Sequence, residues 1–129
     1  MDQSPSCQWV FPRVSGETIN FCRPTDSNSF VKGFFDIQEP DESCSVVPLE
    51  DIAGVLVPGL AFDTRGARLG RGKAFYDKTL MNYRGERVGI AFSFQVEEDG
   101  LPLEPWDIKM SALVTENQVY EIERQSQEY

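Results

Sequence analysis

The sequence predicts an α/β domain with more strand than helix, and three segments carry the prediction. Residues 52–57 and 88–92 are almost continuously apolar, which is typical of strands that helices cover on both faces of a parallel sheet. Between them, residues 74–82 place apolar side chains at helical spacing. Strands that alternate with a helix in this order indicate an α/β fold.

The amino-terminal part predicts a hairpin. Residues 8–14 and 18–22 have the composition of two short strands, and Ser15-Gly16-Glu17 between them is turn chemistry. Polar composition predicts loops at 23–28 and 39–43, and residues 30–37 are left without an assignment.

The remaining elements follow the same patterns. Pro58-Gly59 ends the first apolar run, and a glycine-rich basic segment separates it from the helix. Two more short strands are expected at 112–114 and 119–122. A chain of 129 residues fits one core, so residues 1–129 are expected to form a single domain.

The composition excludes several classes of protein. No apolar run approaches the roughly 18 residues of a membrane span, and the first residues lack the pattern of a secretory signal. Three cysteines without CxxC spacing argue against a disulfide framework or a zinc ribbon, so we expect a cytoplasmic protein. The absence of histidine excludes Ser/His and Cys/His nucleophiles and His-ligated metals.

Charge is distributed unevenly. Residues 63–88 contain seven basic and three acidic residues, a local charge of +4 within a chain of net charge −9. Such an island attracts a small anion, whereas the acidic remainder repels an extended polyanion, so no nucleic acid partner is expected. A solvated basic helix face is the alternative interpretation.

Gly70-Arg71-Gly72-Lys73 lies inside this island, between a predicted strand and the helix. Glycine amides, a helix amino terminus and two cationic side chains can together hold a phosphate. The segment is not a Walker A loop, because Ala74 follows Lys73 where that motif has Ser or Thr. A glycine turn with incidental basic residues therefore stays open as the alternative.

The longer segment around this loop resembles the signature of the 5-formyltetrahydrofolate cyclo-ligase family, also called methenyltetrahydrofolate synthetases. The resemblance runs through Val57-Pro58-Gly59-Leu60-Ala61-Phe62-Asp63 and Gly66-Ala67-Arg68-Leu69-Gly70-Arg71-Gly72-Lys73-Ala74-Phe75-Tyr76-Asp77. Flanking pieces also resemble the family: residues 11–14, Gly33 to Glu39-Pro40, 88–92 with Gln95, Leu101-Pro102, Trp106-Asp107 and 114–116.

The resemblance implies a fold and an activity. The fold would have three layers, with a mainly parallel sheet flanked by helices as in the NagB, RpiA and CoA-transferase group, and it would be shortened at its amino terminus. The activity would be the cyclisation of 5-formyltetrahydrofolate to 5,10-methenyltetrahydrofolate, with ATP and Mg²⁺. An alternative stays open: a catalytically inactive shortened relative that binds nucleotide or phosphate. Uncovered apolar surface would lead such a chain to form a homo-oligomer. No membrane partner is expected.

The resemblance also implies site residues. The nucleotide would contact Arg68, Leu69, Gly70, Arg71, Gly72, Lys73, Ala74, Phe75 and Tyr76. The folate would contact Arg71, Gly72, Lys73, Ala74, Phe75, Glu39 and Trp106. Arg71, Lys73 and Tyr76 are the catalytic candidates, and Asp77 and Asp107 the Mg²⁺ ligands. Without the family, Asp77 reads as a structural acid near a helix start and Trp106 as a packing residue.

The sequence departs from the family pattern at three positions. Ala74 and Phe75 stand where Gly and Tyr are usual, which adds a methyl group beside the loop and removes a hydroxyl. Ser111 stands where an Asp is common, which removes one carboxylate from the acidic side of the site.

Overall fold

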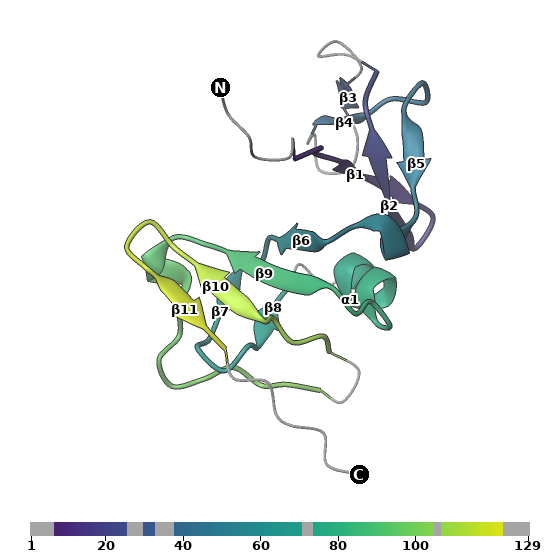
Figure 1. Cartoon of the computed structure of the whole chain (residues 1–129). Coiled ribbons are helices and arrows are strands. Elements are labelled where there is room, and N and C mark those ends of the chain that lie inside the picture. Colours follow the sequence, from purple (N-terminus) through teal and green to yellow (C-terminus); the bar gives the residue numbers. More distant parts are fainter. Residues whose placement is uncertain (1–6, 26–29, 33–37, 71–73, 105–106, 123–129) are drawn as a thin grey trace. The chain divides into compact units, whose positions relative to one another are not determined.

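The computed structural model describes residues 7–25, 30–32, 38–70, 74–104 and 107–122 (Figure 1). The chain divides into two compact units, Met1–Asp51 and Ile52–Tyr129, and each is described by itself. The expectation of a single domain across residues 1–129 stays a prediction.

The first unit is built on an antiparallel sheet. β1 (Phe11–Ser15) and β2 (Thr18–Arg23) form the predicted hairpin, with Gly16 at a φ of 62° in the turn. β5 (Ser45–Val47) pairs with the other edge of β2, which gives the order β1-β2-β5. Ile19, Phe21, Cys22 and Cys44 form the buried core of this unit.

Two further strands of the first unit correct the sequence-based assignment. β3 (Phe30–Lys32) pairs antiparallel with β4 (Gln38–Pro40). Glu39 and Pro40 were expected in a loop, yet they lie in β4, because Glu39 pairs with Val31. A short 3-10 turn, η2 (Leu49–Asp51), ends the unit.

The second unit contains a four-stranded mixed sheet in the order β11-β10-β9-β6 (Figure 1). Three strands are parallel: β6 (Gly54–Val57), β9 (Glu86–Ile90) and β10 (Ala112–Val114). β11 (Val119–Glu121) closes one edge in the antiparallel direction. All four strands confirm predicted segments.

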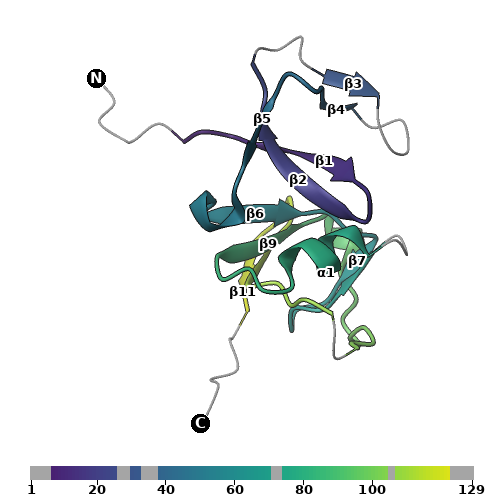
Figure 2. The ribbon, with the colours of Figure 1, turned by 90° about the vertical axis from the view of Figure 1, so that its right-hand side faces the viewer.

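Smaller elements surround this sheet. β7 (Ala61–Phe62) and β8 (Arg68–Leu69) form an antiparallel pair that the sequence did not predict. α1 (Phe75–Leu80) is shorter than its predicted range and lies beside β9 (Figures 1 and 2). η3 (Ser93–Gln95) is a 3-10 turn that follows β9.

The core of the second unit lies on one face of the sheet. Val57 and Leu113 have no exposed surface, and the fully buried Phe62 packs over Gly89 between them. A Cβ atom on Gly89 would come within 2.6 Å of the Phe62 ring, so the absence of a side chain there admits the ring.

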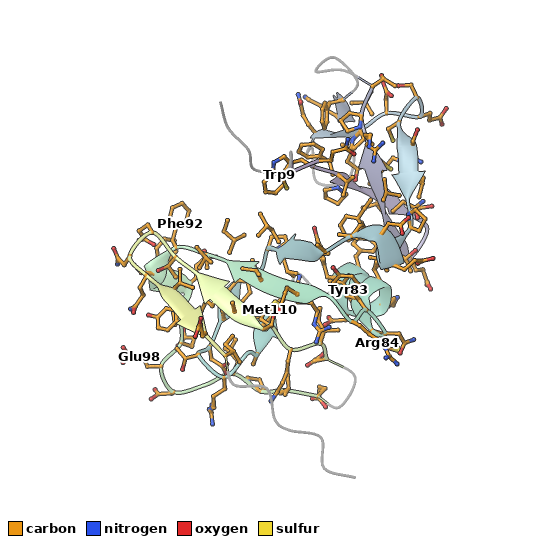
Figure 3. All side chains as sticks on the ribbon, viewed as in Figure 1. Trp9, Tyr83, Arg84, Phe92, Glu98 and Met110 are labelled. Atoms are coloured by element: carbon orange, nitrogen blue, oxygen red, sulfur yellow. The ribbon has the colours of Figure 1, made fainter. Side chains whose placement is uncertain are left out.

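The opposite face of the sheet is apolar and open. Leu56 and Ile90 are 49% and 47% exposed, and Val119 projects from the same face of β11. Phe92, which follows β9, points away from the sheet (Figure 3) and stacks on Phe94 with ring centroids 5.7 Å apart. The expected coverage of both faces by helices is therefore not confirmed among the described residues, in which α1 is the one α-helix.

Candidate functional site

The segment from Val57 to Asp77 begins at the carboxyl end of β6 and returns through β7 and β8 to α1. Because β6 and β9 are parallel, their carboxyl ends lie at the same edge of the sheet. This edge is where α/β folds usually bind their ligands.

Asp63 shapes the turn between β7 and β8. Its carboxylate accepts hydrogen bonds from the amides of Arg65 (2.9 Å), Ala67 (2.9 Å) and Leu101 (2.9 Å). Burial alone would raise the pKa of Asp63, but the three amides lower it below its ordinary value. Asp63 is thus a charged residue that holds the turn in place. An Asp followed three residues later by a Gly, here Gly66, is a turn signal that would have identified this role of Asp63 in the sequence.

Arg68, predicted to contact the nucleotide, is held inside the protein. Its side chain is 8% exposed, and its Nε donates to the carbonyl oxygen of Pro58 at 2.6 Å. Its Nη1 lies 3.8 Å from a carboxylate oxygen of Asp77, and its guanidinium carbon lies 5.3 Å from the Tyr76 ring centroid. Arg68 therefore connects the end of β6 to the start of α1.

Two predicted metal ligands lie near this guanidinium. Burial lowers the pKa of Arg68, while the negative charges of Asp77 and, more weakly, Asp107 act in the opposite direction. Asp77 also accepts a hydrogen bond from the amide of Ile108 at 3.2 Å. Asp107 accepts one from the amide of Glu104 at 2.9 Å. The structure thus places Asp77 next to the backbone of Ile108, the residue that follows Asp107.

Tyr76 and Ala74 occupy the start of α1. Burial raises the pKa of Tyr76, with Arg68 opposing, so the phenol keeps its proton at neutral pH. Ala74 has a φ of 58°, the one positive value outside glycine among the described residues. Its carbonyl accepts the amide of Lys78 at 2.9 Å, which closes the first turn of the helix.

The other predicted nucleotide and folate contacts are described in part. Leu69 is half exposed, and Gly70 lies under the Arg68 guanidinium, where a Cβ atom would come within 3.0 Å of Nη1. Phe75 begins α1 and is half-buried. Arg71, Gly72, Lys73 and Trp106 lie outside the described residues, so their assignment as site residues stays a prediction.

Glu39 belongs to the first unit, in β4. Its carboxylate accepts a hydrogen bond from the amide of Val14 at 3.1 Å. Its expected contact with the folate stays a prediction.

Ser111 forms hydrogen bonds with the backbone of the sheet. It stands where the family often has Asp. Its hydroxyl accepts the amide of Arg87 at 2.9 Å and lies 3.0 Å from the carbonyl oxygen of the same residue. Sequence reasoning treated Ser111 as a lost carboxylate and did not foresee this link between β9 and β10.

Gln95 was noted in the sequence only as a flanking match. Its side-chain amide donates to the carbonyl oxygens of Gly59 (3.1 Å) and Leu60 (3.2 Å), directly after β6. No local pattern indicates this contact, because it joins residues 35 and 36 positions apart.

Within the part of the chain that is described, no three metal-binding side chains gather into one group. No helix of that part has the length and apolar composition needed to cross a bilayer.

Comparisons with known proteins identify a family and several relatives. The model of the 5-formyltetrahydrofolate cyclo-ligase family matches residues 8–116. A protein of Escherichia coli K12 named 5-formyltetrahydrofolate cyclo-ligase is 44% identical over 116 residues, which cover 87% of this chain and 63% of that protein. A mitochondrial protein of that name in Arabidopsis thaliana is 39% identical over 67% of this chain and 35% of its own length.

Two solved structures are also similar. An NMR structure of the 5,10-methenyltetrahydrofolate synthetase of Aquifex aeolicus superimposes with a TM-score of 0.75 and 41% identity, covering 93% of this chain and 61% of that one. A 5,10-methenyltetrahydrofolate synthetase from Mycoplasma pneumoniae gives a TM-score of 0.59 at 27% identity, covering 81% and 53%. The chain thus spans 53–63% of the length of these three bacterial relatives, and it belongs to the 5-formyltetrahydrofolate cyclo-ligase family.

Proposed function

We propose that this chain carries out the ATP- and Mg²⁺-dependent cyclisation of 5-formyltetrahydrofolate to 5,10-methenyltetrahydrofolate. The observation that carries the proposal is the grouping of Arg68, Tyr76 and Asp77 around one guanidinium, next to the amide of Ile108, within the segment that the family model matches. Arg71 and Lys73 lie between Arg68 and Tyr76 in the sequence.

The chemistry suits a site without histidine. Transfer of a phosphoryl group to the formyl oxygen requires that two ligands be positioned and that phosphate charge be neutralised, and it requires no protein nucleophile. In the proposal, Arg71 and Lys73 stabilise the negative charge of the transferring group. Tyr76 donates a hydrogen bond from its protonated phenol, which its raised pKa favours. Glu39 and Trp106 contact the folate.

The carboxylates fit the requirements of Mg²⁺. This ion commonly takes one or two protein carboxylates and completes its shell with water and phosphate oxygens, so Asp77 and Asp107 are sufficient in number and type. Asp77 already lies 3.8 Å from a cation, the guanidinium of Arg68. When bound, Mg²⁺ would neutralise phosphate charge, and Arg68 would keep the Asp77 carboxylate oriented.

The open sheet face supports a proposal about assembly. Leu56, Ile90 and Val119 expose apolar surface that seldom stays in water, so we expect the chain to form homo-oligomers. Light scattering at micromolar concentration measures this directly, and a monomeric mass would contradict it. The three-layer, helix-flanked arrangement and a cytoplasmic location likewise remain parts of the proposal.

The test of function is a turnover assay. The chain is incubated with 5-formyltetrahydrofolate, ATP and Mg²⁺, and the absorbance of the methenyl product is followed. We expect turnover that requires both ATP and Mg²⁺. We expect Lys73→Ala to abolish most of it while leaving the unfolding temperature nearly unchanged, because lysine side chains are almost never fully buried unless they are paired. A wild-type chain with neither turnover nor binding of MgATP at millimolar concentration would refute the proposal.

A further inference from the structure

The side chain of Gln95 makes the least expected hydrogen bonds near the site. Its Nε2 donates to the carbonyl oxygens of Gly59 and Leu60, at 3.1 and 3.2 Å, and its Oε1 accepts the amide of Phe92 at 2.9 Å. Both ends of the side-chain amide are therefore engaged with the backbone. The contact ties η3 to the turn that follows β6.

The same turn is held from a second direction. Arg68 donates from Nε to the carbonyl oxygen of Pro58 at 2.6 Å. Side-chain donors thus reach the carbonyls of all three residues of the turn, Pro58, Gly59 and Leu60. The amide of Leu60 in turn donates to the carbonyl oxygen of Leu69 at 2.7 Å.

The Pro58–Leu60 turn packs closely against β8, so a movement of one would move the other. A Cβ atom on Gly59 would lie 3.0 Å from the Phe62 ring, 3.1 Å from Cγ of Arg68 and 3.2 Å from the carbonyl oxygen of Leu69. β8 ends at Leu69 and leads directly into Gly70. A shift of the turn would therefore displace the residues that introduce the predicted phosphate loop.

We propose that Gln95 is a positioning residue of the nucleotide site, which acts by fixing the Pro58–Leu60 turn against β8. The inference rests on the proposed function, because the nucleotide site is part of that proposal. Gln95 acts through backbone carbonyls and through Arg68 and Leu69. Its loss should loosen the turn and weaken nucleotide binding together.

The first measurement is amide hydrogen exchange in the nucleotide-free chain. Gln95→Ala should speed exchange of the Leu60 amide about tenfold, the factor expected when about one hydrogen bond no longer holds the turn. Gln95→Glu keeps an acceptor for the Phe92 amide but loses the donors to Gly59 and Leu60, so it should loosen the turn as well.

Ser93→Ala is the matched control. Ser93 lies in the same 3-10 turn, and its hydroxyl donates to Glu116 at 2.9 Å, so its loss also removes one side-chain hydrogen bond from η3. We expect Ser93→Ala to change global stability about as much as Gln95→Ala and to leave exchange at Leu60 unchanged.

The second measurement is the binding of MgATP by calorimetry. Gln95→Ala and Gln95→Glu should raise the dissociation constant about five- to tenfold, and Ser93→Ala should leave it within twofold. Unchanged protection of the Leu60 amide in Gln95→Ala, or a loosened turn with unchanged MgATP affinity, overturns the inference. Wild-type protein that binds no MgATP while the variant turn loosens overturns the proposed function instead.

Discussion

Ala74 occupies a backbone conformation that suits glycine, and replacing it should stabilise the protein. Its φ of 58° and ψ of 27° lie in the left-handed region, where an L-residue with a Cβ atom costs about 1–2 kcal/mol. Ala74→Gly removes this cost but gives the unfolded chain more freedom, which offsets about 0.5–1 kcal/mol. The expected net gain in the free energy of unfolding is therefore about 0.5–1 kcal/mol.

Urea denaturation followed by circular dichroism measures this gain, and the unfolding temperature should rise by about 2–4 °C. Ala112→Gly is the matched control, because Ala112 lies in β10 with ordinary strand geometry. That substitution should cost about 0.5–1 kcal/mol or more. If Ala74→Gly destabilises the chain as Ala112→Gly does, Ala74 does not hold the left-handed conformation and the reasoning fails.

Three further substitutions test the packing of the second unit. Asp63→Asn should lower the free energy of unfolding by about 2–3 kcal/mol, because the amide group places a donor against a backbone N–H. Folding lowers the pKa of Asp63, so this loss, measured by urea denaturation, should have its whole value above the unfolded pKa of about 3.9. The loss should shrink as the pH falls through the pKa of the folded state. Gly89→Ala should cost about 1–3 kcal/mol by thermal unfolding, because its methyl group would meet the Phe62 ring at 2.6 Å; an unchanged midpoint would contradict that contact. The hydroxyl of Tyr83, labelled in Figure 3, donates to the carbonyl oxygen of Ile52 at 2.6 Å. Tyr83→Phe should therefore lower the free energy of unfolding in urea by about 1 kcal/mol. Equal stability of the two proteins would show that water replaces the bond.

The strands of the parallel sheet could be predicted because local composition marks them. The apolar runs at 52–57 and 88–92 became β6 and β9, and the hairpin at the amino terminus followed from its turn residues. The short pair β7 and β8 could not be predicted in this way, because each strand has two residues and depends on pairing with the other.

For the site, the sequence predicted which residues lie close together but did not predict which of them hold others in place. Family resemblance placed Asp77, Tyr76 and Arg68 in one segment, and the structure joins them through one guanidinium. The resemblance assigned Arg68 to the nucleotide, which stays a prediction, and in the structure its partners are the Pro58 carbonyl and the Asp77 carboxylate. A sequence motif records which residue types a site uses, and it does not distinguish those that contact a ligand from those that hold the contacting residues in place.

This distinction has a physical basis in burial. A buried guanidinium must satisfy its charge and its N–H groups inside the protein, because leaving them unpaired away from water costs several kcal/mol. Arg68, at 8% side-chain exposure, meets that requirement with the Pro58 carbonyl and the Asp77 carboxylate. Removing the guanidinium would take away the ion pair between Arg68 and Asp77 and one side-chain donor to the turn. The positions of β8 and of the start of α1 therefore depend on the hydrogen bond and the ion pair of this one guanidinium.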